Sequence, residues 1–199
     1  MKKSISLILF LAASVATVAQ DFDKNIADAR SSYTSGKLQD SRFAMEQMLR
    51  DLDMAIGKEI LKVIPVKIAT LAAEENGDNL SASGGGAGLF VQRNYGSDER
   101  RGTVEIINNS PLINSLNAIL SMPVLGGMMR DENQKVVKIQ GYKSLLNKQV
   151  NTDTGKTNYE LQIPMNNTLV TVKIADSNEG EITAAANTLP LSKIVQMAQ

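Results

Sequence analysis

The segment Tyr159-Glu-Leu-Gln-Ile-Pro-Met-Asn-Asn-Thr-Leu-Val-Thr-Val-Lys-Ile174 decides the predicted fold of this chain. Apolar and polar side chains alternate on both sides of Asn166-Asn167. Alternation with a period of two is typical of strands that bury one face, and a pair of asparagines favours a tight turn. The segment therefore predicts two antiparallel strands joined by a hairpin, the first over Tyr159–Ile163 and the second over Leu169–Ile174.

Three further segments show the same alternation: Leu89–Tyr95, Thr103–Asn108 and Lys135–Gln140. Gly141 predicts a bulge or bend in the third of these strands, which then continues to Leu146. These segments and the hairpin described above make five predicted strands.

Two helices are predicted among these strands. One begins at Ser110-Pro111, a capping residue followed by proline at the first helical position, and ends before Pro123. The other follows the capping residues Asp176–Glu179 and is interrupted by Pro190. The order is β-β-α-β-β-β-α. Because short connections favour antiparallel pairing, we expect an α+β fold with an antiparallel five-stranded sheet and helices packed on one face of it.

A helical hairpin is predicted over residues 20–73, before this sheet domain of residues 89–199. Apolar residues recur at helical spacing over residues 22–33, and Gly36 favours a helix end. A longer amphipathic helix runs from Met45 to Ile64, where Pro65 limits it because proline lacks an N–H donor. Its polar residues are expected mostly on the other side of the helix: Glu46, Gln47, Arg50, Asp51, Asp53, Lys58 and Lys62.

Residues 74–88 are predicted to form a glycine-rich linker between the hairpin and the sheet. The run Gly84-Gly-Gly-Ala-Gly88 could suggest a phosphate-binding loop. Such a loop needs a Lys-Ser/Thr pair and a following helix, whereas a predicted strand follows here. A flexible joint or an irregular strand edge is the favoured interpretation.

Residues 1–19 have the pattern of a secretory signal peptide. Lys2 and Lys3 precede an apolar stretch over residues 5–15, and Thr17-Val-Ala19 supplies small residues for cleavage after Ala19. The absence of cysteine excludes a lipid anchor on a cysteine after the leader. We therefore expect a periplasmic or secreted protein with no transmembrane segment in the mature chain.

The composition excludes several kinds of chemistry. The 199 residues include 21 basic and 21 acidic side chains but no histidine, cysteine or tryptophan. A serine–histidine triad, an imidazole zinc site, a thiol nucleophile and a disulfide are therefore impossible. Removing residues 1–19 takes away two lysines and no acid, which leaves 19 − 21 = −2 charges. Such a protein has no broad electrostatic attraction for nucleic acid, and we expect no cofactor.

Three polar or sulfur patterns were weighed as possible sites. Met45, Met48 and Met54 could bind copper(I), but two of them lie on the apolar stripe and favour core packing. Asn151-x-Asp153-x-Gly155 resembles a calcium loop without its ligand order, so a solvated turn is favoured. No spacing among the acidic residues indicates a carboxylate pair for glycoside hydrolysis. No catalytic, cofactor-binding or metal-binding residue is therefore assigned.

Two parts of the chain resemble known families. Ala29…Tyr33-x-x-Gly36-x-Leu38-x-x-Ser41 resembles the core of one tetratricopeptide unit, and a single unit implies packing on the rest of the protein. Lys135-Val-Val-Lys-Ile-Gln-Gly-Tyr-Lys143, Tyr159–Ile163 and Leu169–Ile174 resemble small secreted bacterial domains of the PsbP/Mog1-like type. That resemblance covers about residues 88–197. It implies an antiparallel sheet flanked by helices, used for binding and assembly, and it carries over no functional residue.

The sequence predicts an exported, non-enzymatic binding or interaction protein of the bacterial cell envelope, whose ligand is a protein or a small apolar molecule. One alternative is an envelope-assembly or signalling accessory that docks a partner through its helical hairpin, with an exposed apolar groove between residues 22 and 64. A second alternative is a carboxylate-dependent hydrolase, which needs two acids facing each other in a cleft.

Overall fold

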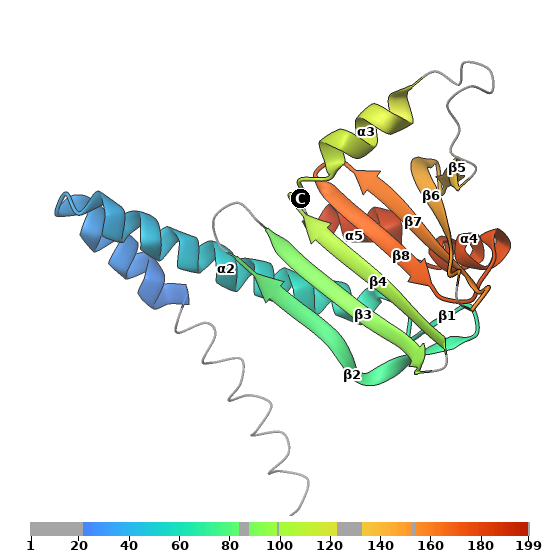
Figure 1. Ribbon diagram of the computed structural model, residues 1–199. Coiled ribbons are helices and arrows are strands. Elements are labelled where there is room, and N and C mark those ends of the chain that lie inside the picture. Colours follow the sequence, from blue (N-terminus) through green and yellow to red (C-terminus); the bar gives the residue numbers. More distant parts are fainter. Residues whose placement is uncertain (1–21, 84–87, 99, 123–132, 153, 199) are drawn as a thin grey trace, which may run out of the picture.

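The computed structural model describes residues 22–83, 88–98, 100–122, 133–152 and 154–198 (Figure 1). A helix over residues 22–34 precedes the long helix α2 (Leu38–Val63). Four strands follow: β1 (Lys67–Ile68), β2 (Leu71–Ala82), β3 (Leu89–Ser97) and β4 (Arg100–Asn108). The rest of the chain forms α3 (Ile113–Ser121), β5 (Gln134–Ile139), β6 (Tyr142–Val150), β7 (Thr157–Met165), β8 (Thr168–Ile174), α4 (Glu179–Asn187) and α5 (Leu191–Ala198).

The strands form one eight-stranded sheet in the order β1-β2-β3-β4-β8-β7-β6-β5. Every neighbouring pair is antiparallel. At its centre, Val104 lies opposite Val172 and Ile106 opposite Val170, and none of these four side chains is exposed. Alternate residues of a strand point to opposite faces, so this register gathers aliphatic side chains on one face of the sheet. That face forms the main core.

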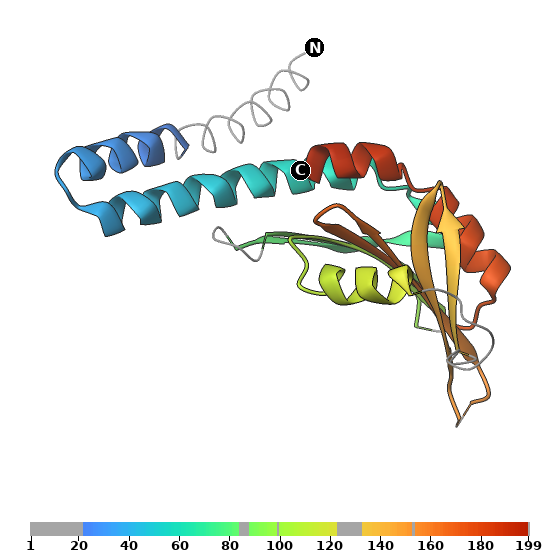
Figure 2. The ribbon, with the colours of Figure 1, turned by 90° about the horizontal axis from the view of Figure 1, so that it is seen from above.

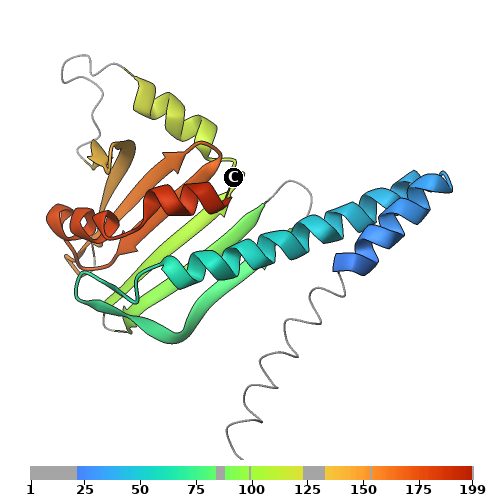
Figure 3. The ribbon, with the colours of Figure 1, turned by 180° about the vertical axis from the view of Figure 1, so that it is seen from behind.

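Helices lie on both faces of the sheet, which is bent (Figure 2). α2, α4 and α5 cover the outside of the bend and contribute the buried residues Ile60, Ile182 and Ile194 to the main core (Figure 3). α3 lies inside the bend, where Leu116 packs near Leu145 and Leu169 in a second, smaller cluster. The inner, concave face is therefore only partly covered by a helix.

The α+β class is confirmed, but the predicted five-stranded sheet is wrong. The predicted strand running from Lys135 through Gly141 to Leu146 is two strands, β5 and β6, which pair in an antiparallel hairpin. Gln140 and Gly141 have φ angles of 48° and 90°, so together they form the two-residue turn of that hairpin. The other two additional strands, β1 and β2, come from residues 67–82.

The predicted organisation of an N-terminal hairpin, a linker and a sheet domain is also corrected. The two helices of the predicted hairpin are present, but they do not form a unit apart from the sheet, because Ile60 and Ile64 at the C-terminal end of α2 are buried in the main core. Residues 74–82 of the predicted linker form most of β2, and residues 84–87 lie outside the described residues. The expectation that the helices share one sheet face is wrong for α3, which packs on the face opposite to α4 and α5.

Two further sequence expectations concern the signal peptide and membrane-spanning helices. The predicted leader, residues 1–19, lies outside the described residues. Within the part of the chain that the structure describes, no helix combines the length and the hydropathy needed to cross a membrane.

Candidate functional site

The first half of α2 and the helix over residues 22–34 project together beyond the end of the sheet (Figures 1 and 3). Small residues hold the two helices together: Ala29, Ser41 and Ala44 are 2–6% exposed, and the Ser41 hydroxyl donates to the Ala29 carbonyl oxygen at 2.9 Å. We call the helix over residues 22–34 together with residues 38–53 of α2 the arm.

The arm exposes an unusual amount of apolar surface. Thirteen large apolar side chains are exposed in the described part of the chain, and seven of them, each 42–65% exposed, lie in the arm: Ile26, Tyr33, Leu38, Phe43, Met45, Leu49 and Leu52. Contiguous apolar side chains mark interaction surfaces more often than scattered ones do, and Ile26, Tyr33 and Met45 of this set line one hollow. The apolar residues of α2 thus serve two purposes, core packing near its end and surface exposure near its start.

The sheet fixes the direction in which the arm points. A Cβ atom added at Gly57 would lie 2.2 Å from Leu80 Cδ1, so the backbone of α2 lies directly on side chains of the sheet at this position. At the end of the helix, Arg93 Nη1 donates to the Ile64 carbonyl oxygen at 2.8 Å and the Tyr95 hydroxyl donates to that of Pro65 at 2.7 Å.

The two β3 side chains that bind this helix end, Arg93 and Tyr95, have raised pKa values. Arg93 forms a bidentate ion pair with Asp78, at 2.7 and 2.6 Å, and this hydrogen bonding raises the pKa of its guanidinium. Burial raises the pKa of the Tyr95 phenol. Both groups therefore keep their protons and remain donors to the carbonyl groups at the end of α2.

A cleft of about 480 Å³ lies between the arm and the nearby end of the sheet. One wall is a single face of α2 and the other is the start of β3 and the end of β4, and the lining residues are Arg42, Met45, Glu46, Leu49, Asp53, Gly88, Asn108 and Asn109. Gly88 has a φ of +64°, and a Cβ atom there would lie 2.3 Å from the Asn108 carbonyl oxygen. The absence of a side chain at Gly88 is therefore what allows the two strands to meet at this wall.

Asp53 is the unpaired charge of the cleft. Arg42 forms its ion pair with Glu46, with a Nε–Oε1 distance of 3.0 Å. Among the described residues, Asp53 has no ion pair and no side-chain hydrogen bond. Burial raises the pKa of its carboxyl because a partly dehydrated carboxylate is destabilised. The cleft thus combines an apolar wall, formed by Met45 and Leu49, with one negative charge that lacks a partner.

A second hollow continues the same surface along the arm. It has a volume of about 280 Å³ and is lined by Ile26, Ala29, Arg30, Tyr33, Met45 and Met48. Met45 lines both this hollow and the cleft. The two hollows meet at Met45; the one near Tyr33 is lined mainly by apolar residues with Arg30 beside them, and the cleft carries the unpaired Asp53.

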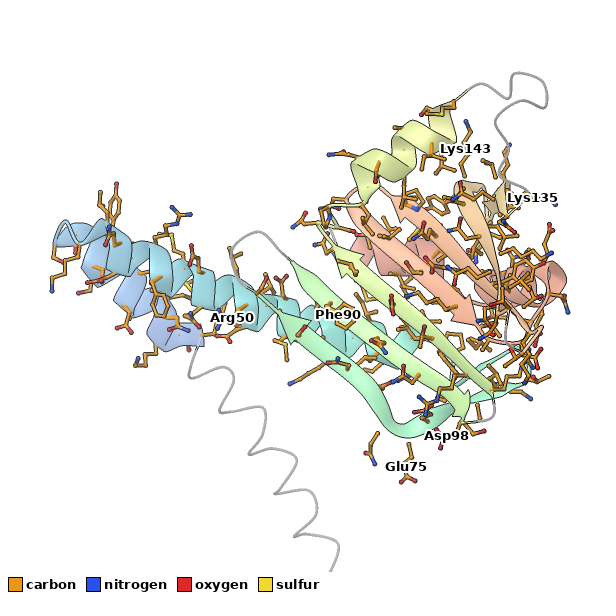
Figure 4. The ribbon with its side chains drawn as sticks, viewed as in Figure 1. Arg50, Glu75, Phe90, Asp98, Lys135 and Lys143 are labelled. Carbon is orange, nitrogen blue, oxygen red and sulfur yellow. The ribbon has the colours of Figure 1, made fainter. Side chains whose placement is uncertain are left out.

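The concave face of the sheet has a different, polar character. Figure 4 shows side chains standing on the front of β4, β8 and β7, with Phe90 on β3 at the margin. Lys173 of β8 lies between the strands that carry Glu105 and Glu160, and its Nζ is 3.1 Å from Glu105 Oε2. Two hollows, of about 270 and 570 Å³, share Gln149 and Glu160. This face therefore carries a partly exposed ion pair between Lys173 and Glu105.

The residues weighed from the sequence have varied positions in the structure. Met45 and Met48 line the apolar hollow and Met54 is half-buried on α2, whereas Gly88 lines the cleft. Asp153 lies outside the described residues. The described residues contain no group of three or more His, Cys, Asp or Glu side chains placed to hold a metal ion.

Sequence reasoning missed the most distinctive residue of the cleft. Asp53 was expected mostly on the polar side of the helix, but it lies on the same face as Met45 and Leu49. Its spacing of four residues from Leu49, which is itself four residues from Met45, is the signal that could have identified it. Asn108 and Asn109 gave no signal, because only the fold brings the end of β4 to α2.

Comparisons of this chain with protein-family models, with curated proteins and with solved structures found no match.

Proposed function

We propose that this chain is an exported, non-enzymatic interaction protein of the bacterial cell envelope that binds a protein partner through its arm. The observation that supports the proposal best is the concentration of exposed apolar side chains there, which include Phe43, Met45 and Leu49. The export part of the proposal rests on the leader pattern of residues 1–19.

The size of the apolar surface fits a protein partner. Fully burying one large apolar side chain contributes about 1.5–3 kcal/mol, so covering about half of each of the arm's exposed apolar side chains contributes roughly 5–10 kcal/mol before the costs of association. A helical pair that presents such side chains matches a common mode of recognition, in which apolar residues at helical spacing form the contact.

The experiment compares two charge-introducing variants of the mature protein. Phe43→Glu with Leu49→Glu places charges on the arm, at side chains that are 63% and 54% exposed. Val136→Glu with Val150→Glu is the matched control, because these side chains lie on the sheet and are 46% and 50% exposed. Each tagged protein is used to capture partners from an envelope extract of the producing cells, and the captured proteins are quantified by mass spectrometry.

We expect proteins captured by the unmodified chain and by the control to be lost from the arm variant. Circular dichroism should show the same helical content for all three proteins. An arm variant that folds and still captures the same partners in the same amounts would refute the proposal.

A further inference from the structure

We propose that the cleft between α2 and the ends of β3 and β4 binds a lysine or arginine side chain carried by an amphipathic segment of the protein partner. This inference rests on the proposed function, because it assigns a chemistry to the partner that the arm binds. It names Asp53 as the residue that contacts the cation and Met45 and Leu49 as the residues that contact the apolar part of the segment.

The first support is the arrangement of residues along one face of α2. Met45, Leu49 and Asp53 follow one another at intervals of four residues and all line the cleft. Residues at this spacing lie above one another on a helix. A side chain with a long aliphatic stem and a charged end matches this order of two apolar residues and one carboxylate, as lysine and arginine do.

The second support is the balance of charge in the cleft. Three charged side chains line it: Arg42, Glu46 and Asp53. Arg42 and Glu46 neutralise each other at 3.0 Å, and the Arg42 side chain is 82% exposed, so it points largely to solvent. The net charge that remains is the single negative charge of Asp53. A cation in the cleft would therefore restore the stabilisation that the carboxylate loses through partial burial.

The opposite wall offers the side-chain amides of Asn108 and Asn109 and no additional charge. Asn108 Oδ1 accepts a hydrogen bond from the Asn109 amide at 2.9 Å, and Asn109 Oδ1 accepts one from Asn167 Nδ2 at 2.9 Å. Asn108 Oδ1 accepts a second hydrogen bond from the Thr168 hydroxyl at 3.5 Å, whereas Asn109 Oδ1 has one donor and two lone pairs and so retains acceptor capacity. An ammonium or guanidinium group can donate to Asn109 Oδ1, and the wall carries no charge that would repel it.

A basic side chain fits these features better than a metal ion does. Asp53 and Glu46 are the only carboxylates among the described residues that line the cleft, and Glu46 is already paired with Arg42. Two of the five residues on the helix wall, Met45 and Leu49, are apolar, and a hydrated metal ion does not need such contacts. Exposed apolar side chains beside the cleft, such as Leu52, supply the contact for the rest of an amphipathic segment.

The test uses n-hexylammonium and n-hexanoate, which have the same aliphatic chain and opposite charges. Each is titrated into the ¹⁵N-labelled mature protein at pH 7. Binding is measured by NMR from the chemical shifts of the backbone amides of Met45, Leu49, Asp53 and Asn109. We expect hexylammonium to shift these amides and to bind about fivefold more tightly than hexanoate, as a partly exposed charge pair does. Equal binding of the two compounds, or shifts elsewhere only, would overturn the proposal.

Two variants assign the preference to one carboxylate. Asp53→Asn should abolish the preference for hexylammonium, and Asp40→Asn should keep it. Asp40 is the matched control because it lies on the same helix, is exposed and does not line the cleft. A preference that survives in Asp53→Asn, or that disappears equally in Asp40→Asn, would contradict the assignment.

The capture experiment distinguishes failure of this inference from failure of the proposed function. If Asp53→Asn and the arm variant both lose the partner, both proposals are supported. If the arm variant loses the partner and Asp53→Asn retains it fully, the arm still binds a partner but the inference about the basic side chain is wrong. If neither variant loses the partner, the proposed function itself is refuted and the inference falls with it.

Discussion

Replacing Arg93 by methionine tests how the end of α2 is held on the sheet. The Arg93 side chain is 11% exposed, and it makes two hydrogen bonds to Asp78 and one to the Ile64 carbonyl oxygen. Methionine keeps an unbranched side chain of similar reach but removes all three donors. The substitution therefore leaves the Ile64 carbonyl and the Asp78 carboxylate without this partner.

The expected cost follows from these contacts. A hydrogen bond from a charged donor contributes about 1.5–3 kcal/mol, and the ion pair adds less than about 1 kcal/mol because Asp78 is 35% exposed. We expect the free energy of unfolding to fall by about 2–4 kcal/mol. For a domain of this size each kcal/mol corresponds to about 2–4 °C, so Tm should fall by about 4–16 °C.

The assay is unfolding of the mature protein in urea, with Arg101→Met as the matched control. Arg101 lies in β4 and pairs with Asp98 on the β3–β4 hairpin, but these side chains are 66% and 92% exposed. Its replacement should cost less than about 0.5 kcal/mol, because exposed ion pairs contribute little. Equal losses in the two variants, or a loss below about 1 kcal/mol for Arg93→Met, would refute the reasoning.

Three further predictions concern the cleft and the leader. Asp53→Asn should raise the free energy of unfolding at pH 7 by less than about 1 kcal/mol, and this gain should vanish below about pH 4. The reason is that the native pKa of Asp53 is raised. The protonated Asp53 therefore costs no stability below the unfolded pKa, and the cost appears as the pH rises through the native pKa and the carboxyl ionises. Urea unfolding at several pH values measures this, and a larger gain at low pH would contradict it. In the same assay Gly88→Ala should lower the free energy of unfolding by at least about 2 kcal/mol, and Gly155→Ala by only about 1 kcal/mol. Both glycines have a positive φ, but only at Gly88 would the new Cβ atom meet a backbone, that of Asn108. Equal costs would argue against this close approach. Intact mass of the exported protein should correspond to a chain that starts at Gln20, and a mass that includes residues 1–19 would exclude cleavage after Ala19.

The parts of the fold that the sequence predicted are those with strong burial on one face. The predicted strands around Val104, Leu161 and Val172 lie within β4 and β7, where alternate residues are buried, and within β8, where nearly every residue is buried. In β4 and β7 the alternation of apolar residues corresponds directly to the buried face. The α+β class could therefore be predicted from local patterns.

The strands that the sequence did not predict, β1 and β2, lack this alternation of apolar and polar residues. β2 lies next to the edge of the sheet, most of its residues are not buried, and its register shifts between Ala73 and Asp78. Glu75, labelled in Figure 4, is one of its exposed residues. A strand of this kind is held by backbone pairing with β3, and that pairing leaves no alternation for sequence analysis to detect.

The turn between β5 and β6 was misread for a local reason. A two-residue hairpin turn with positive φ at both positions usually has Asn-Gly or Asp-Gly. Here Gln140 adopts the first position, with a φ of 48°, and donates from its side chain to the carbonyl oxygens of Asn187 and Leu189. These tertiary hydrogen bonds offset the unfavourable backbone conformation, and they cannot be predicted from the segment alone.

The cleft was hidden because the two halves of α2 face different partners. Ser41 hydrogen-bonds to Ala29 of the helix over residues 22–34, whereas Ile60 packs on the sheet. An apolar stripe defined over the whole helix combines these two environments. For this reason the sequence pattern placed Asp53 mostly on the polar side. The position of the sheet relative to α2 was needed to place Asp53 in the cleft.

The length and continuity of α2 have a mechanical consequence. It is one uninterrupted helix of 26 residues, about 39 Å long at 1.5 Å per residue. Its final turns are clamped to the sheet while its beginning is free of it, so a force on the free end is transmitted as torque to the clamp. Such a rigid lever sets the orientation of whatever it holds, whereas a flexible tether would limit only the distance.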